Sequence, residues 1–462
     1  MKERLQPDAL AGLPAGSARA PAGVTPLRGD LHSLVAWLDS HTNFESGMPA
    51  RASAPTLDRS IELCRLLGDP QRAYPTLHVT GTNGKGSTVR MLSNLIAATG
   101  LSVGTYTSPN LSLVNERICR GEEPISDEEL GDVLYSLAQI ETLLADRPTR
   151  FELLSAAGFA WFADVAVDVA VIEVGLGGRW DATNVISPEV AVVTNISYDH
   201  VEVLGPTLKD IAVEKSGILK SGCRPVIGET SPELLRIFED EATRSGSLEP
   251  WVRDRDFGCE ADQVAVGGRL VDLRTPGARY EDLFISLHGA HQVGNAACAL
   301  AAAEAFFGSP LDDGLVREVL GSVRVPGRLE LAGSDPVVLL DGAHNAAGME
   351  VLGRALSEEL RATGPTVAVV GMLTGRDPSA MLRPLASAGV GALVACTAPC
   401  ERALPAAVVS EAAGACGIES VVVEQVGAAL ARAREMAGSD GMVVVTGSLY
   451  VVGAARSLCA TR

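Results

Sequence analysis

The chain has few aromatic side chains and no apolar run long enough to cross a membrane. Aromatic residues make up 4% of its 462 residues, although hydrophobic residues make up 47% in total. No uninterrupted apolar run reaches the roughly 18 residues that a membrane-spanning helix needs. We therefore expect no membrane partner. The 21% of charged residues beside this apolar fraction is typical of a soluble globular protein.

Positive charge is also scarce. The chain has 38 Lys and Arg residues against 57 Asp and Glu residues, which gives a formal net charge of −19. Such a surface repels a phosphate backbone, so we expect no nucleic acid partner. The nine cysteines form no CxxC pair, which argues against a zinc site and against a disulfide framework. A reducing cytoplasm is the compartment that we expect.

The length of the chain predicts two domains. Residues 1–29 are rich in Ala, Pro and Gly and lack the apolar core of a secretory signal, so we expect a flexible leader there. Glycine and proline interrupt the helical periodicity near the stretch VRVPGRLE, which predicts a linker at 323–330. The domains are then expected over 30–322 and 331–462.

Short apolar runs alternate with helical patterns in both predicted domains. Near-continuous Val, Ile and Ala runs are typical of parallel sheets that are covered on both faces. Strands are expected at 76–81, 101–107, 168–175, 189–196 and 224–228, and then at 336–343, 365–373, 391–397, 420–426 and 441–448. Helices are expected at 31–41, 56–68, 91–99, 291–308 and 348–364, with short strands and turns over 250–288.

The stretch HVTGTNGKGST at residues 78–88 has the composition of a phosphate-binding loop between a strand and a helix. Glycines let backbone N–H groups approach an anion, and the start of the following helix adds a partial positive charge. Lys85 supplies a charge for the outer phosphates. The spacing of the common G-x4-G-K-[ST] motif is not met, because Val79 stands where its first glycine would fall. A glycine-rich turn that caps a helix remains the alternative.

Oxygen ligands for magnesium are expected beside this loop. Ser87 or Thr88 offers a hydroxyl, and Glu173 ends an apolar strand. The next strand leads to Asp199 and His200, which places them at the same edge of a parallel sheet. A solvated glutamate and a helix-capping histidine are the alternatives. The fold class that we predict is α/β, with a P-loop-type parallel-sheet domain followed by a smaller Rossmann-like domain.

Lys215 lies in the unusually apolar stretch IAVEKSGILK. A lysine of this kind is ordinarily a surface residue that pairs with a nearby acid such as Glu214 or Asp210. A lysine that is held neutral can instead react with carbon dioxide to give a carbamate. Composition does not decide between these two states.

Seven sequence blocks together resemble folylpolyglutamate synthase and dihydrofolate synthase, of the Mur ligase superfamily. In chain order they are HVTGTNGKGST, VNERI, IEVGLGGRWDATNV, NISYDHVEVLGPTLKDIAVEKSGILK, HQVGNAA, VPGRLE and LDGAHN. The resemblance runs from about residue 31 to the C-terminus. It implies that ATP activates a carboxylate as an acyl phosphate, which the amino group of L-glutamate then attacks.

The resemblance also implies roles for individual residues. The nucleotide loop would be Gly81, Thr82, Asn83, Gly84, Lys85, Gly86, Ser87 and Thr88, with Lys85 on the β- and γ-phosphates. Ser87 and Glu173 would bind a first magnesium ion, His200 would contribute to a second, and Lys215 matches a carbamylated lysine. The remaining nucleotide contacts would be Gln292 and Asn295 near the adenine, Arg328 on the phosphates, Asp341 on the ribose and His344 at the phosphate end.

The acceptor side is implied by the stretch RPTRFELLSAA at 147–157, which resembles a pterin-binding segment. Thr149, Phe151 and Asp181 are the candidates there, with Phe151 stacking on the ring and Asp181 accepting its N–H groups. A core phenylalanine and a loop aspartate are the alternatives. Ser448 and Tyr450 resemble residues near the glutamate site.

The chain departs from the family pattern at several positions, namely Asn110, the pair at 120–121, Ala346, and Arg376 with Asp377. These departures leave the acceptor open: a folate, dihydropteroate or another acid. Rival functions are a Mur-like ligase for a different carboxylate and a P-loop nucleotide switch that binds a protein partner. We expect a monomer; the number of added glutamates is not encoded in any motif.

Overall fold

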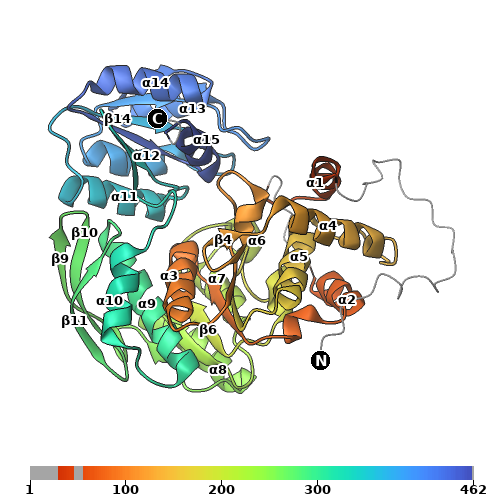
Figure 1. Cartoon of the computed structure of the whole chain (residues 1–462). Helices are drawn as coiled ribbons and strands as arrows, with labels where there is room; N and C mark the ends of the chain where they lie inside the picture. The colour runs from red at the N-terminus through yellow and green to blue at the C-terminus, as the bar shows by residue number, and fades with distance from the viewer. Residues whose placement is uncertain (1–29, 46–55, 460–462) are drawn as a thin grey trace.

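The computed structural model describes residues 30–45 and 56–459. The predicted leader at 1–29 lies outside the described residues, as do 460–462. The C-terminal α/β unit lies above one side of the N-terminal α/β unit, and helices cover both faces of each main sheet (Figure 1). The predicted α/β fold class is confirmed.

The N-terminal domain is built on an eight-stranded sheet in the order β4-β3-β2-β5-β1-β6-β7-β8. Strands β2, β5, β1, β6, β7 and β8 run parallel, as the apolar runs predicted. The strands are β1 (Thr76–Thr80), β2 (Val103–Tyr106), β3 (Ile118–Arg120), β4 (Glu123–Pro124), β5 (Val169–Glu173), β6 (Val190–Val193), β7 (Arg224–Ile227) and β8 (Trp251–Val252).

One edge of this sheet differs from the prediction. Strands β3 and β4 pair antiparallel with β2 and with each other, so the sheet is mixed. Their residues are few and partly polar, which leaves no apolar run for sequence reasoning to detect. An antiparallel edge on an otherwise parallel sheet is common in α/β proteins.

Helices pack on both faces of this first sheet and open several of its loops. The predicted helix at 91–99 begins earlier, because the phosphate-loop lysine already forms its first turn. The helices are α1 (Leu31–Asp39), α2 (Asp58–Leu66), α3 (Lys85–Ala98), α4 (Asp127–Glu141), α5 (Arg150–Asp164), α6 (Val201–Leu204), α7 (Leu208–Ser216) and α8 (Pro232–Ser245). Short 3-10 turns lie at η3 (Pro70–Arg72), η4 (Val114–Arg117) and η5 (Ala182–Val185).

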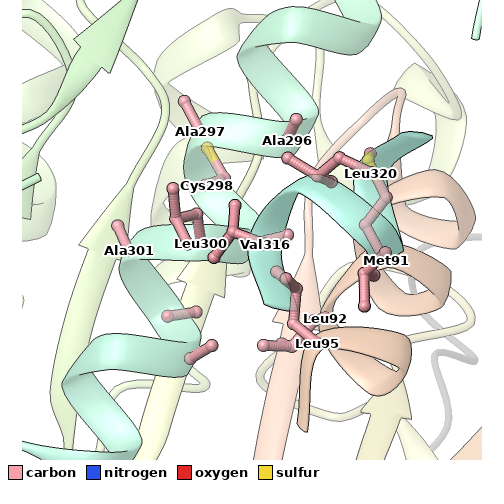
Figure 2. Close-up of a cluster of buried hydrophobic side chains, with 14 of the residues drawn as sticks. Met91, Leu92, Leu95, Ala296, Ala297, Cys298, Leu300, Ala301, Val316 and Leu320 are labelled. Atoms are coloured by element: carbon pink, nitrogen blue, oxygen red, sulfur yellow. The ribbon is translucent and has the colours of Figure 1, made fainter. Parts of the chain in front are cut away.

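A small antiparallel sheet and two helices complete this domain. Strands β9 (Gly258–Ala265), β10 (Gly268–Arg274) and β11 (Arg279–Ile285) confirm the short strands expected over 250–288. Helix α9 (Ala290–Phe307) packs on α3, and α10 (Asp313–Ser322) closes the same core (Figure 2). Small alanine side chains let α9 approach α3 closely. Each leucine that α3 buries there stabilises the fold by about 1.5–3 kcal/mol. The core residues that Figure 2 labels are Met91, Leu92, Leu95, Ala296, Ala297, Cys298, Leu300, Ala301, Val316 and Leu320.

The C-terminal domain has a six-stranded sheet in the order β12-β13-β17-β14-β15-β16. Neighbouring strands in this sheet run parallel, except that β12 pairs antiparallel with β13. Strand β12 was not predicted. The strands are β12 (Glu330–Ser334), β13 (Val337–Leu340), β14 (Thr366–Val370), β15 (Ala392–Ala395), β16 (Glu419–Val422) and β17 (Met442–Thr446). The helices are α11 (Ala346–Glu358), α12 (Pro378–Ser387), α13 (Ala406–Ala415), α14 (Val426–Ala437) and α15 (Leu449–Cys459). Strand β12 thus begins at the last residue of the predicted linker.

None of the helices within 30–45 and 56–459 combines the length and apolar character that crossing a membrane requires.

His78 is a fully buried imidazole on β1. Its Nε2 lies 2.8 Å from Thr183 Oγ1, and its Nδ1 has no partner within the described part of the chain. Burial, and secondly the charge of Lys220, lowers the pKa of His78 well below its usual 6.5. The folded protein keeps this ring neutral, while the unfolded chain protonates it near its ordinary pKa.

The neutral His78 makes stability depend on pH. Its contribution is fully present above about pH 6.5 and is lost as the pH falls below that value, by up to about 1.4 kcal/mol per pH unit. His78→Gln should make the pH dependence of thermal unfolding shallower between about pH 6.5 and 5. His32→Gln, which changes an exposed histidine, should leave that dependence unchanged. The same slope in H78Q and the parent protein would contradict this assignment.

Candidate active site

The glycine-rich loop after β1 is held open by backbone geometry and by its neighbours. A Cβ atom built on Gly81 would lie 1.8 Å from Thr194 Oγ1, and one on Gly84 would lie 2.3 Å from Asn295 Oδ1. Both glycines have positive φ, at 150° and 82°. Thr82 N–H donates to Asn195 O at 2.9 Å. Only glycine therefore fits these two positions, and the loop backbone faces the cavity without side chains in the way.

Half-buried Lys85 and buried Lys215 meet at this loop. Lys85 Nζ donates to Gly81 O at 3.1 Å and to Thr82 O at 3.2 Å, and Lys215 Nζ donates to Gly81 O at 2.8 Å. Burial lowers the pKa of Lys85, and burial followed by repulsion from Lys85 lowers the pKa of Lys215 to about 7. Lys215 is 4% exposed, so the alternative of a surface lysine is wrong.

Glu173 is the acidic group beside this loop. It ends β5 opposite Val79 of β1, which brings its carboxylate next to the helix start. Its Oε2 accepts from Ser108 N–H at 3.2 Å and would lie 3.5 Å from a Cβ atom on Gly86. Burial raises the pKa of Glu173 to about 7, although Lys85 opposes that rise. A buried carboxylate of this kind gains from a bound cation.

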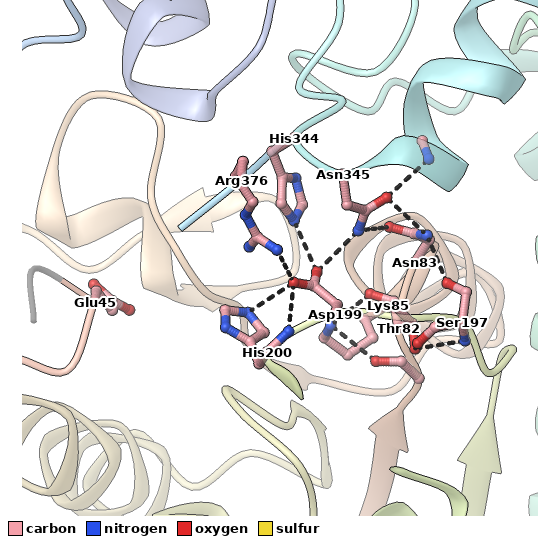
Figure 3. Close-up of polar contacts among 12 residues, drawn as sticks. Glu45, Thr82, Asn83, Lys85, Ser197, Asp199, His200, His344, Asn345 and Arg376 are labelled. Carbon is pink, nitrogen blue, oxygen red and sulfur yellow. Dashed lines mark hydrogen bonds and ion pairs between the residues drawn. The ribbon is translucent and has the colours of Figure 1, made fainter. Parts of the chain in front are cut away.

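Asp199 joins the two domains at the same edge of the sheet (Figure 3). Its carboxylate pairs with Arg376, accepts from Asn345 Nδ2 at 2.9 Å and lies 3.5 Å from His344 Nε2. Burial would raise the pKa of Asp199, but His344, His200 and Arg376 together hold it well below its usual value. Burial also lowers the pKa of His200, which favours a neutral ring there.

A cavity of about 540 Å³, the larger cavity, lies between the two domains around this loop. Arg328 and Asp341 enter it from the C-terminal side; Asp341 accepts from the N–H groups of Leu329 at 2.9 Å and Ala343 at 3.0 Å. Thr88 and Gln292, both fully buried, do not line it. The predicted residues that line it are Gly81, Thr82, Asn83, Gly84, Lys85, Gly86, Ser87, Glu173, His200, Lys215, Asn295, Arg328, Asp341 and His344.

A second cavity of about 190 Å³, the smaller cavity, adjoins the first. It is lined by Thr149, Phe151, Asp181, Ser448 and Tyr450, which are the residues expected on the acceptor and glutamate side. Thr149 and Asp181 also have local roles. Thr149 Oγ1 caps α5, and Asp181 accepts from Leu176 N–H at 2.8 Å and from Thr183.

The two cavities share part of their walls. Ser108, Pro109, Gly175, Leu176, His200, His344 and Leu449 line both. A group held in the smaller cavity is therefore next to the phosphate loop, at the point where His200 and His344 face each other across the domains. The arrangement suits transfer of a phosphoryl group between two bound molecules.

Several lining residues of the smaller cavity were missed from the sequence. Phe44 and Trp180 add aromatic surface in a chain that has few aromatic residues. Glu45 binds Arg117 in a bidentate pair at 2.6 and 2.8 Å, and Arg402 Nη1 donates to Glu45 O at 3.1 Å. Trp180 belongs to the block IEVGLGGRWDATNV, beside Asp181, but no local pattern marks Glu45 or Arg402.

The donor atoms beside the loop decide what kind of magnesium site could form there. Within the described residues, no three His, Cys, Asp or Glu side chains are placed to form a metal site by themselves. Magnesium commonly takes one or two protein oxygens, with phosphate and water completing its shell. Ser87 and the buried carboxylate of Glu173 suit a magnesium ion that phosphate and water also bind. They do not form a site made of protein ligands alone.

Each half of the chain matches a known domain family. A model of the Mur ligase middle domain matches residues 79–303, and a model of the Mur ligase glutamate ligase domain matches residues 327–449. The chain is 39% identical over 366 residues to dihydrofolate synthase/folylpolyglutamate synthase of Mycobacterium tuberculosis, covering 75% of this chain and 74% of that protein. It is 35% identical over 407 residues to folylpolyglutamate synthase of Lacticaseibacillus casei, covering 86% and 93%.

Solved structures agree. Mycobacterium tuberculosis folylpolyglutamate synthase complexed with ADP matches with a TM-score of 0.86 and 36% identity, covering 94% of this chain and 98% of that one. Escherichia coli FolC in complex with DHPP and ADP matches with a TM-score of 0.82 and 30% identity, covering 95% and 100%. The fold and the site define a Mur ligase. The chain belongs to the folylpolyglutamate synthase/dihydrofolate synthase family, and it is an ATP-dependent ligase of folate metabolism.

Proposed function

We propose that the enzyme joins L-glutamate to the carboxylate of a folate or of dihydropteroate, through an acyl phosphate made with ATP. The observation that carries this proposal is the wall that the two cavities share, with His200 and His344 in it. An acceptor in the smaller cavity then presents its carboxylate to a terminal phosphate in the larger one. The relatives' complexes with ADP, and with DHPP and ADP, support both occupants.

The nucleotide is held by the loop and by residues from both domains. The N–H groups at the start of α3 and the ammonium of Lys85 bind the outer phosphates. Arg328 adds a planar guanidinium that suits phosphate oxygens, and Asp341 accepts from the ribose. Asn295 contacts the loop from α9, and we assign it, with Gln292 behind it, to the adenine end.

We propose that magnesium binds through Ser87 and Glu173, with a second ion near His200. Magnesium supplies charge neutralisation, which lets an anionic carboxylate approach the anionic phosphate. Lys215 is buried and its pKa is lowered to about 7, which favours the neutral amine that reacts with carbon dioxide. A carbamate on Lys215 would carry a negative charge and attract Lys85, whereas a protonated Lys215 repels it.

The acceptor site follows from the chemistry of the smaller cavity. Phe44, Phe151 and Trp180 offer flat apolar surface for an aromatic bicyclic ring, while buried Asp181 offers a carboxylate to ring N–H groups. Ser448 and the guanidinium groups of Arg376 and Arg402 lie on the C-terminal side. They suit the carboxylates of the incoming glutamate.

We propose that 323–330 acts as the hinge between the domains, and that closure excludes water from the acyl phosphate. One chain supplies both sides of each cavity, so we propose that it works as a monomer.

All nine cysteines are free, which is consistent with our proposal of a cytoplasmic location.

An acceptor-dependence assay tests this function. Purified protein with ATP, magnesium and L-glutamate should release phosphate only when dihydropteroate or tetrahydrofolate is added, and chromatography should show the glutamylated product. Testing the two acceptors side by side identifies the substrate. Phosphate release without any acceptor would favour a nucleotide switch, and dependence on an unrelated acid would favour a different Mur-like ligase.

A further inference from the structure

Glu359 directly follows α11 and reaches across to the N-terminal domain. Its side chain is 2% exposed. One carboxylate oxygen accepts from Arg269 Nη1 at 2.7 Å and from Gly289 N–H at 2.9 Å, and the other lies 2.7 Å from His288 Nδ1. Three partners from one domain thus surround a single carboxylate of the other.

Arg269 is fixed on its own side of this contact. It lies on β10 of the three-stranded sheet, and its Nε donates to Asp262 Oδ1 at 2.7 Å. Figure 1 shows that this small sheet lies beside α11. The sheet lines neither cavity, so it does not touch the reactants, but its Arg269 contacts Glu359 of the C-terminal domain.

The contact joins the two helices that face each other across the larger cavity. Gly289 is the N-cap of α9, whose first turns bring Asn295 into that cavity. Helix α11, which ends just before Glu359, lines the opposite side with Glu350 and Arg354. Glu359 itself lines neither cavity, so it acts on the nucleotide only through the position of the domains.

The charge of Glu359 is compensated where it stands. Burial would raise the pKa of Glu359, but His288, the N–H of Gly289 and Arg269 together lower it. Removing one partner of a buried charge pair is costly, because the other charge stays buried without compensation. An exposed pair of the same charges would contribute little.

We propose that Glu359, with Arg269 and His288, is the tie that holds the C-terminal domain closed over the nucleotide. Glu359 is a positioning residue, and the three-stranded sheet is its docking platform. The inference rests on the proposed ATP site between the domains.

Glu359→Gln tests the tie, because it removes the charge while keeping the shape. The KM for ATP should rise about tenfold, since apparent affinity falls with the fraction of closed protein. The value of kcat at saturating ATP should stay within about twofold, because bound nucleotide restores closure. Small-angle scattering should show a more extended nucleotide-free protein. Glu358→Gln, the same change at the exposed neighbouring residue, should leave all three unchanged.

A double-variant comparison separates a specific tie from general damage. Arg269→Gln should raise the KM for ATP as Glu359→Gln does, and the double variant should match the single ones instead of multiplying their effects. If either variant fails to fold, Arg269→Lys keeps the charge, loses the contact of Nε with Asp262, and should give a smaller rise in the same KM. A normal KM in E359Q, a loss confined to kcat, or multiplied effects would overturn the tie. Absence of ligation in the unsubstituted enzyme would instead overturn the proposed function.

Discussion

Lys85→Met is expected to lower kcat/KM for ligation by about 100- to 1000-fold, the cost of removing one group that stabilises charge in a transition state. Lys85 is the half-buried cation of the phosphate loop, and loop carbonyls hold its ammonium in place. Methionine keeps most of the apolar stem but cannot meet the outer phosphates. The rate of product formation, followed by chromatography, measures the loss.

A matched control separates this loss from a change of net charge. Lys209→Met removes one positive charge from an exposed residue that pairs with Glu233, and it should leave ligation unchanged. Binding of ADP to the Lys85 variant should weaken as well, since the β-phosphate loses its partner. Near-normal turnover in K85M would reject the assignment of this loop to phosphate.

Lys215→Ala is expected to lower ligation by about 10- to 100-fold, the usual effect of losing a group that orients a metal site. Short carboxylic acids such as acetate or formate should restore part of the activity, because they can occupy the space that a carbamate would fill. The rescue distinguishes a missing anion from a missing cation, which ammonium salts or amines would replace.

The same assignment has a direct chemical test. The intact mass of the protein in bicarbonate should increase by the mass of one carbon dioxide, and the increase should be absent from Lys215→Ala. Lys215→Arg keeps a cation that cannot form the carbamate, so it should lose at least as much activity as Lys215→Ala, even in bicarbonate. An unmodified Lys215 together with full activity would contradict the carbamate proposal.

The main strands could be predicted because they are buried, and buried strands consist of unbroken apolar runs. Strands β5 and β17, for example, lie within the predicted ranges and are buried throughout. Strands β4 and β12 could not be predicted, because an exposed antiparallel edge needs no apolar run and is formed only by pairing with a neighbour.

The site divides in the same way. Glu173 was identified because it stands at a strand end, where parallel topology brings loops together, and Lys85 because it lies in a glycine-rich loop between a strand and a helix. Glu45 and Arg402 were missed because they reach the smaller cavity from segments that lie far apart in sequence. Arg376 was noticed only as a departure from the family pattern; its pairing with Asp199 depends on the approach of the two domains.

The residues common to both cavities come from both domains, since Ser108 and His200 face His344 and Leu449 there. Drawing the domains apart would consequently breach both compartments in a single movement. The same opening then controls the entry of both reactants and the release of the nucleotide and the product. A change that speeds product release would therefore also let more of the acyl phosphate escape.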